Sequence, residues 1–68
     1  MNGHKDIHKY KTNVDGLFKK SPVLTTTEIA TSLDVSWNTA EKLMLELTIE
    51  GSVQRIKKAG VNLWVKIK

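Results

Sequence analysis

Apolar side chains in the first third of the chain recur at the spacing of an α-helix, with lysines between them. The recurring positions are Ile7, Tyr10, Val14, Leu17 and Phe18. This pattern predicts a first helix from about Lys5 to Lys19, and we expect residues 1–4 to be disordered. Ser21 and Pro22 should end the helix, because the residue before a proline avoids the helical conformation.

The sequence TTTE marks the start of a second helix. Thr25 and Glu28 have the spacing of a capping box, in which the threonine oxygen accepts from an amide three residues on and the glutamate reaches back. We therefore predict a helix over about residues 26–33. The two apolar residues before it, at 23–24, are enough only for a stub of strand.

A third helix is predicted over residues 37–50, because Ser36 is a favourable cap and Gly51 supplies a left-handed stop. At about 100 degrees per residue, its apolar positions form one stripe along the helix. That stripe consists of Ala40, Leu43, Met44 and Leu47. Asn38 and Lys42 fall on the opposite face, so the helix should have one buried and one exposed side.

After Gly51 the apolar period changes from that of a helix to that of a strand. The segments SVQRI (52–56) and LWVKI (63–67) are predicted strands, and the KKAGVN segment between them tolerates turn geometry. The result is a hairpin with a basic tip. Trp64 alternates with its neighbours along the last strand and should lie in the core or half-buried at its edge, where it covers the third helix.

Charge is distributed unevenly along the chain. Residues 1–20 contain five lysines and two aspartates, a net charge of +3, and residues 52–68 carry +5 from five basic side chains. Residues 21–51 hold one lysine and five acids, a net charge of −4. Both ends of the chain are therefore basic, which suits a polyanionic partner.

Several functional classes are disfavoured by composition and motif. The chain has no cysteine, which excludes disulfides and thiolate zinc ligands. His4 and His8 stand four residues apart, but two imidazoles make a weak metal site, so we expect solvent-facing histidines and no metal. Because no catalytic serine–histidine–acid set or phosphate-binding glycine loop is recognisable, we expect no enzyme activity, cofactor or small-molecule ligand. No signal peptide or stretch of roughly 20 apolar residues is present, so we expect a cytoplasmic protein.

The predicted order of helix, strand stub, helix, tight turn, helix and hairpin resembles a winged helix-turn-helix domain. Residues 24–53, LTTTEIATSLDVSWNTAEKLMLELTIEGSV, carry the resemblance, and with the hairpin it covers about two-thirds of the chain. The matching scaffold positions are Thr27, Glu28, Ile29, Ala30, Leu33, Val35, Ser36, Thr39, Ala40, Leu43, Leu47, Gly51 and Val53. The resemblance implies a single α+β domain over residues 1–68, of element order α-β-α-α-β-β, with a recognition helix at 37–50 and a wing at about 57–62. It also implies a small transcription regulator that binds double-stranded DNA.

The first turns of the third helix offer side chains that can recognise DNA bases. Asparagine pairs with adenine, a threonine or an aromatic ring contacts the thymine methyl, and lysine can hydrogen-bond to a base edge. The candidate base-reading residues are Trp37, Asn38, Thr39 and Lys42, because domains of this kind place this end of the helix in the major groove. For Trp37 an alternative is open, in which the ring folds back over Val35 or the second helix and belongs to the core.

Hydroxyl groups near the helix starts and polar or basic groups of the wing are candidates to bind DNA phosphates. They are Thr25, Thr26, Thr27, Ser36, Arg55, Lys57, Lys58 and Asn62. The lysines have a second explanation, because charge at an exposed strand edge discourages pairing with another strand.

Several residues of the third helix do not fit a surface devoted to DNA. Glu41 is interpreted as a solvated surface residue, although a glutamate can also accept a hydrogen bond from cytosine. Leu45 and Ile49 lie four residues apart on the outer face and suggest a contact with a second copy, with another protein or with the N-terminal segment of this chain. The alternative function is therefore a winged-helix protein-interaction module, with a homodimer as one form of it. The other explanation is that Leu45 and Ile49 are two scattered exposed apolar residues, which are common on protein surfaces. The first helix offers another dimer surface, made of Tyr10, Val14 and Phe18.

Overall fold

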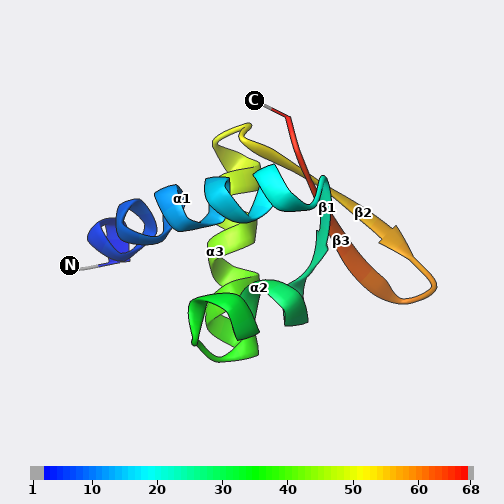
Figure 1. The fold of residues 1–68 in the computed structure, drawn as a ribbon, viewed down its shortest axis with the longest axis horizontal. Coiled ribbons are helices and arrows are strands. Elements are labelled where there is room, and N and C mark those ends of the chain that lie inside the picture. Colours follow the sequence, from blue (N-terminus) through cyan, green and yellow to red (C-terminus); the bar gives the residue numbers. More distant parts are fainter. Residues whose placement is uncertain (1–2, 68) are drawn as a thin grey trace.

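The computed structural model describes the backbone of residues 3–67 and the side chains of residues 10–67. Its elements are α1 (Gly3–Lys20), β1 (Val23–Thr25), α2 (Thr26–Leu33), α3 (Trp37–Ile49), β2 (Val53–Lys58) and β3 (Val61–Lys66). Within the described residues, three helices and a three-stranded antiparallel sheet form an α+β fold of order α-β-α-α-β-β, which is consistent with a winged-helix layout (Figure 1). The predicted fold class is confirmed.

The helix boundaries follow from caps that the sequence encodes. Thr25 and Glu28 form the predicted capping box at α2: Thr25 Oγ1 accepts from the Glu28 amide at 3.1 Å, and Glu28 Oε1 accepts from the Thr25 amide at 2.8 Å. Ser36 caps α3 by accepting from the Thr39 amide at 3.1 Å. Gly51 adopts a φ of +84° just beyond α3, where a left-handed residue ends the helix. These three predictions are confirmed.

The sheet has the order β1-β3-β2, so the C-terminal strand lies between the other two. Leu24 and Arg55 lie opposite Trp64 on its two sides. β2 and β3 remain paired up to a two-residue turn, Ala59-Gly60, in which both residues have positive φ. Such a turn twists in the same sense as the strands that it joins. The β2–β3 hairpin, called the wing from here on, is therefore longer than predicted and its turn is shorter.

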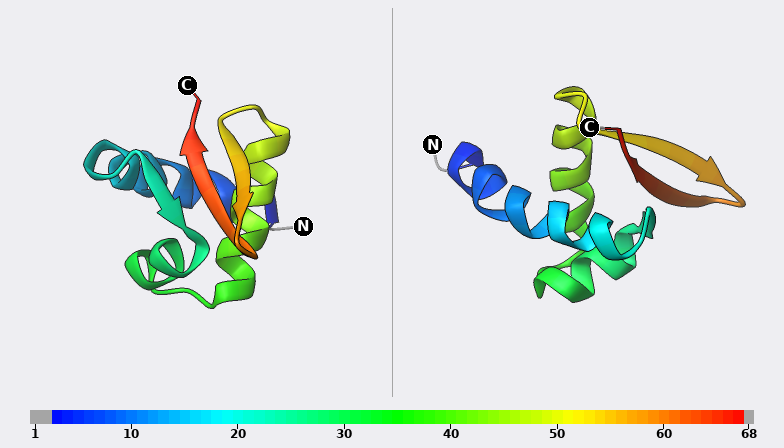
Figure 2. Two further views of the ribbon diagram at one scale, coloured as in Figure 1. Left: turned by 90° about the vertical axis from the view of Figure 1, so that its right-hand side faces the viewer. Right: turned by 45° about the horizontal axis from the view of Figure 1, so that its top comes forward.

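A single hydrophobic core lies between the helices and the inner face of the sheet. It is formed by Val14, Phe18, Leu24, Ile29, Ala30, Ala40, Leu43, Met44, Leu47, Val53 and Trp64. The predicted stripe of α3 lies within it, and Trp64 is fully buried as predicted. The right-hand view of Figure 2 shows the wing and the N-terminal half of α1 projecting from opposite sides of this body.

The first helix differs from its prediction in two ways. It begins at Gly3 rather than near residue 5, and residues 1–2 lie outside the described residues, as do the side chains of His4 and His8. Val14 and Phe18 are buried in the core, and Tyr10 is half-buried against it. The prediction of a dimer surface is therefore wrong for Val14 and Phe18, because these two side chains are already covered within the domain. For the half-buried Tyr10 it stays a prediction. No helix within the described residues is long and apolar enough to cross a membrane.

Candidate nucleic-acid interface

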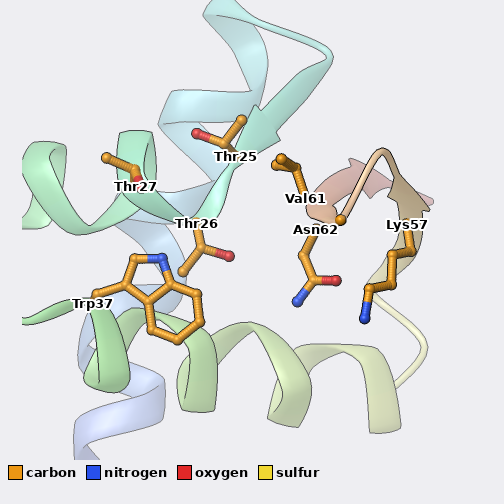
Figure 3. Close-up of a pocket in the computed structure, with 8 residues that line it drawn as sticks. Thr25, Thr26, Thr27, Trp37, Lys57, Val61 and Asn62 are labelled. Carbon is orange, nitrogen blue, oxygen red and sulfur yellow. The ribbon is translucent and has the colours of Figure 1, made fainter.

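A notch lies where the first turns of α2 and α3 meet the wing. Its lining comes from five elements and the wing turn: Thr25, Thr26, Thr27, Trp37, Lys57, Gly60, Val61 and Asn62. Figure 3 shows the Trp37 indole beside Thr26 on one side of the notch, with Asn62 and Lys57 on the other. Segments far apart in the sequence therefore share one concave surface next to the N-terminus of α3.

The four predicted base-reading side chains lie together at this end of α3. Trp37, Asn38, Thr39 and Lys42 are all exposed. Thr39 is oriented by the cap, because the Ser36 hydroxyl donates to Thr39 Oγ1 at 2.9 Å. Ser36 Oγ both accepts from the Thr39 amide and donates to Thr39 Oγ1, so it has no proton left for a partner. The Thr39 hydroxyl keeps its own proton and can donate it to a partner.

Trp37 is 49% exposed, so its ring is divided between protein and solvent. It lines the notch with Thr26 and Asn62, and it is not a member of the buried core cluster. The alternative of a ring folded into the core is thus wrong. One side of the indole packs at the edge of the notch, and the other is open to a partner.

The wing presents its basic side chains on two different faces. Side chains alternate along a strand, so Arg55 and Lys57 share the face of buried Val53, which points toward the helices. Lys58 belongs to the opposite face of the sheet. Arg55, Lys57 and Lys58 are all exposed. The candidate phosphate ligands of the wing therefore do not form one set, because only Arg55 and Lys57 lie on the notch side.

A partly buried chain of hydrogen bonds, called the relay from here on, runs along the floor of the notch from Trp64 to Asn62. Trp64 Nε1 donates to Thr26 Oγ1 at 2.7 Å, and the Thr26 hydroxyl donates to Glu41 Oε1 at 2.8 Å. The other carboxylate oxygen, Glu41 Oε2, accepts from Asn62 Nδ2 at 2.7 Å. The relay therefore connects β3, α2 and α3 through side chains alone.

The relay corrects three predictions made from the sequence. Thr26 is only 3% exposed and its hydroxyl is engaged on both sides, so it is not a phosphate ligand. The amide nitrogen of Asn62 points inward to Glu41 and its Oδ1 is buried, so Asn62 is not available to DNA either. Glu41 is half-buried between two donors, and the interpretation of this residue as a solvated surface acid is wrong.

One signal in the sequence pointed to this arrangement. A buried tryptophan normally finds an acceptor for its indole N–H. The predicted burial of Trp64 therefore implies an acceptor among the polar residues of the neighbouring helices. Periodicity could not identify that partner, because Thr26 lies 38 residues away along the chain.

The N-terminus of α2 is less suited to an anion than its threonines suggest. Thr25 Oγ1 is occupied by the Glu28 amide, and the Glu28 carboxylate lies at the same helix start. A phosphate there would meet a negative charge that already balances the helix dipole. Thr27 is exposed and is the most accessible hydroxyl of the three adjacent threonines.

The second half of the outer face of α3 has a different character. Ile49 is 82% exposed and Leu45 is also exposed, as predicted. Beside them the Glu50 carboxylate pairs with Lys11 of α1 at 3.4 Å. Neither Leu45 nor Ile49 lines the notch.

The described side chains contain no group of three or more histidine, cysteine, aspartate or glutamate residues that could hold a metal ion. The chain matches no protein-family model, no curated protein and no solved structure. Any assignment of function therefore depends on the geometry and chemistry of the surfaces described above.

Proposed function

We propose that the chain binds double-stranded DNA, with the N-terminal turns of α3 in the major groove and the wing on the backbone, as a small transcription regulator. One observation carries the proposal: four side chains able to contact base edges are exposed together at one end of a helix, beside a wing with basic residues on the adjoining face. Helix-turn-helix proteins insert this end of the helix into the groove.

Each exposed group has a defined role in this complex. Asn38 can form a bidentate pair with adenine, and Thr39 and Trp37 can contact a thymine methyl. Lys42 lies one turn further along and can reach a base edge or a phosphate. Arg55 and Lys57 contact phosphates of the flanking backbone, which adds affinity without adding sequence preference.

The acids of α3 are compatible with this orientation. Glu41 is turned inward and held by two donors, and Glu50 is paired with Lys11 at the far end of the helix. Glu46 is half-buried. The exposed charge at the leading end of α3 is therefore the ammonium of Lys42, which favours approach to phosphates.

Duplex titration followed by backbone amide NMR at two salt concentrations tests the proposal. The expected shifts fall on residues 37–42 and on the wing, and the logarithm of the affinity should fall with the logarithm of the salt concentration by about 0.9 for each phosphate contacted. Shifts confined to residues 45–49, or an affinity that salt does not change, would contradict DNA binding through this surface.

A second function is favoured by the exposure of Ile49. An isoleucine that is four-fifths exposed, next to an exposed leucine, is an apolar site that a protein partner can cover. A protein-interaction module would use this surface instead of the notch, with a homodimer as its simplest form. Salt discriminates the two functions, because an apolar contact responds weakly to ionic strength and a phosphate contact responds strongly.

A further inference from the structure

The wing is attached to the rest of the domain unevenly along its length. At its base Val53 and Trp64 are buried in the core. Beyond them the residues of β2 are all exposed, and so are the turn residues and Val61. Among the described residues, Asn62 joins this outer half of the wing to α3 by a side-chain hydrogen bond to Glu41.

The direction of every hydrogen bond in the relay is determined by chemistry. An indole N–H can only donate, so Thr26 must accept from Trp64 and use its single proton toward Glu41. The Asn62 amide donates to the remaining carboxylate oxygen. The group at position 41 must therefore accept twice and donate nothing, which an ionised carboxylate does and a carboxamide does not.

The two ends of this contact belong to the two surfaces that would touch DNA. Glu41 lies one turn after Trp37 on α3, and Asn62 pairs with Lys57 across the wing. Trp37, Lys57 and Asn62 also line the same notch. A change in the Glu41–Asn62 distance would therefore move the phosphate-binding side of the wing relative to the base-reading end of α3.

We propose that the Glu41–Asn62 hydrogen bond is a positioning contact that fixes the angle between the wing and α3. Through it the domain selects DNA in which the bases under α3 and the phosphates under the wing have one relative placement. Glu41 and Asn62 do not touch DNA in this scheme. The effect on DNA selection rests on the proposed function, whereas the effect on the wing angle does not.

This role explains why an acid occupies a helix face that would lie close to phosphates. A free carboxylate there would repel DNA. Bonded to Thr26 and Asn62, the Glu41 charge is directed into the domain, and it strengthens both hydrogen bonds because charge-assisted bonds are shorter and stronger than neutral ones.

The variant Asn62→Ala removes the contact and leaves the Trp64–Thr26–Glu41 part of the relay in place. Gln54→Ala is its matched control, because Gln54 is an exposed amide on the opposite face of the same hairpin. Residual dipolar couplings of backbone amides in β2, β3 and α3 report the wing angle in the free protein. The expected result is a changed angle in Asn62→Ala and the parent angle in Gln54→Ala.

Binding is measured on two duplexes of equal length, one selected by the parent protein from a randomised library and one unrelated to it. Asn62→Ala should lose about tenfold in affinity for the selected duplex and less than about twofold for the unrelated one, because positioning affects recognition more than attraction. A contact that only stabilised the fold would lower the melting temperature and leave the ratio of the two affinities unchanged.

Glu41→Ala is the second variant, with Glu46→Ala as its control for the lost charge on the same helix. Alanine removes both acceptor oxygens, whereas a glutamine could re-form the contact if Asn62 turned over and accepted from it through Oδ1. Glu41→Ala should therefore reproduce the Asn62→Ala result, whereas Glu46→Ala should not. This variant also serves if Asn62→Ala fails to fold.

An unchanged wing angle in both variants would overturn the inference, as would an unchanged affinity ratio on a duplex that the parent does select. Failure of both variants to fold would overturn it too, because the contact would then serve folding rather than orientation. If the parent selects no duplex while the wing angle still changes, the proposed DNA function fails and the positioning of the wing stands.

Discussion

The two halves of the outer surface of α3 differ in chemistry although they belong to one helix and rest on one core. The N-terminal half exposes an indole, an amide, a hydroxyl and an ammonium group, next to the basic wing. The C-terminal half exposes Leu45 and Ile49, next to the Lys11–Glu50 ion pair. The need to form and bury the helix does not explain this difference, because both halves pack on the core through the same apolar stripe.

This difference in chemistry indicates which kind of partner each half can bind. Polar groups at the end of a helix can distinguish base pairs, and a neighbouring cationic strand can attract a duplex without distinguishing them. Aliphatic groups gain free energy only when another apolar surface covers them. A molecule that uses both halves would bind DNA with one and a protein or a second copy with the other.

A cavity in the core beneath α3 should destabilise the helix and therefore both halves of its outer surface. Leu47 is buried beneath α3, and Leu47→Ala should lower the free energy of unfolding by about 2–5 kcal/mol, from lost burial and a residual cavity. Leu45→Ala, on the exposed face of the same helix, should cost less than about 1 kcal/mol. Urea denaturation measures both. Equal losses would mean that α3 does not present these two leucines to different environments.

Asn38→Ala should affect the N-terminal half alone. We expect the affinity for a selected duplex to fall by about 1–3 kcal/mol while the affinity for an unrelated duplex stays close to that of the parent, because an amide–base pair provides specificity. Titration calorimetry on both duplexes measures the difference. Asn13→Ala, which removes an exposed asparagine from α1, is the matched control. Similar losses on both duplexes would assign Asn38 to the backbone rather than to a base.

Trp37→Ala separates recognition from folding. Because about half of the ring is already in contact with solvent, we expect the free energy of unfolding to fall by less than about 1.5 kcal/mol. The affinity for the selected duplex should fall by about 1 kcal/mol, the loss of one base contact. Thermal denaturation and duplex titration measure the two effects. A variant that unfolds, or one that binds DNA as the parent does, would remove Trp37 from the interface.

The two lysines at the tip of the wing should behave differently, although they are adjacent in sequence. Lys57→Ala should weaken binding to all duplexes to a similar extent and lower the salt slope by about 0.9, since it removes one phosphate contact. Lys58→Ala should leave the slope unchanged, because this side chain lies on the face of the sheet away from the notch. Equal slopes for the two variants would contradict the orientation of the wing on DNA.

Ile49→Lys should have the smallest effect on DNA binding and the largest on self-association. Sedimentation should detect a concentration-dependent dimer of the parent that this substitution abolishes, because it places a charge in the apolar contact. The affinity for a short duplex that holds one domain should remain that of the parent. A parent that stays monomeric at millimolar concentration would exclude the homodimer and leave another protein as the only partner for Leu45 and Ile49.

Local signals in the sequence were sufficient for most of the fold. The capping box at Thr25 and Glu28, the cap at Ser36 and the stop at Gly51 each involve residues no more than three positions apart, so their spacing alone identifies them. The stripe of α3 is likewise a property of one helix. Together with the apolar periods of the first helix and of the hairpin, these features predicted the order and type of the elements and placed the base-reading candidates at one end of α3.

The relay could not be predicted in the same way. Glu41 meets donors 15 and 21 residues away, and nothing in its local pattern separates it from the other glutamates of α3. The predicted dimer surface on the first helix was wrong at Val14 and Phe18 for a related reason. The pattern identified these two residues as one apolar face, but it could not identify the rest of the core that covers them. The shorter wing turn requires Ala59 to adopt a φ of 54°. Alanine rarely adopts this conformation, so an alanine at this position does not predict such a turn.

The placement of the two tryptophans, one sealed in the core and one at the surface, gives the molecule two separate optical reporters. Trp64 has no contact with water and donates to a buried hydroxyl, so its emission should respond to unfolding and resist soluble quenchers. Trp37 should be quenched readily in the free protein and protected when a partner covers the notch. Phenylalanine at either position would leave one tryptophan, so the folding and the binding of this chain could be followed independently without any added label.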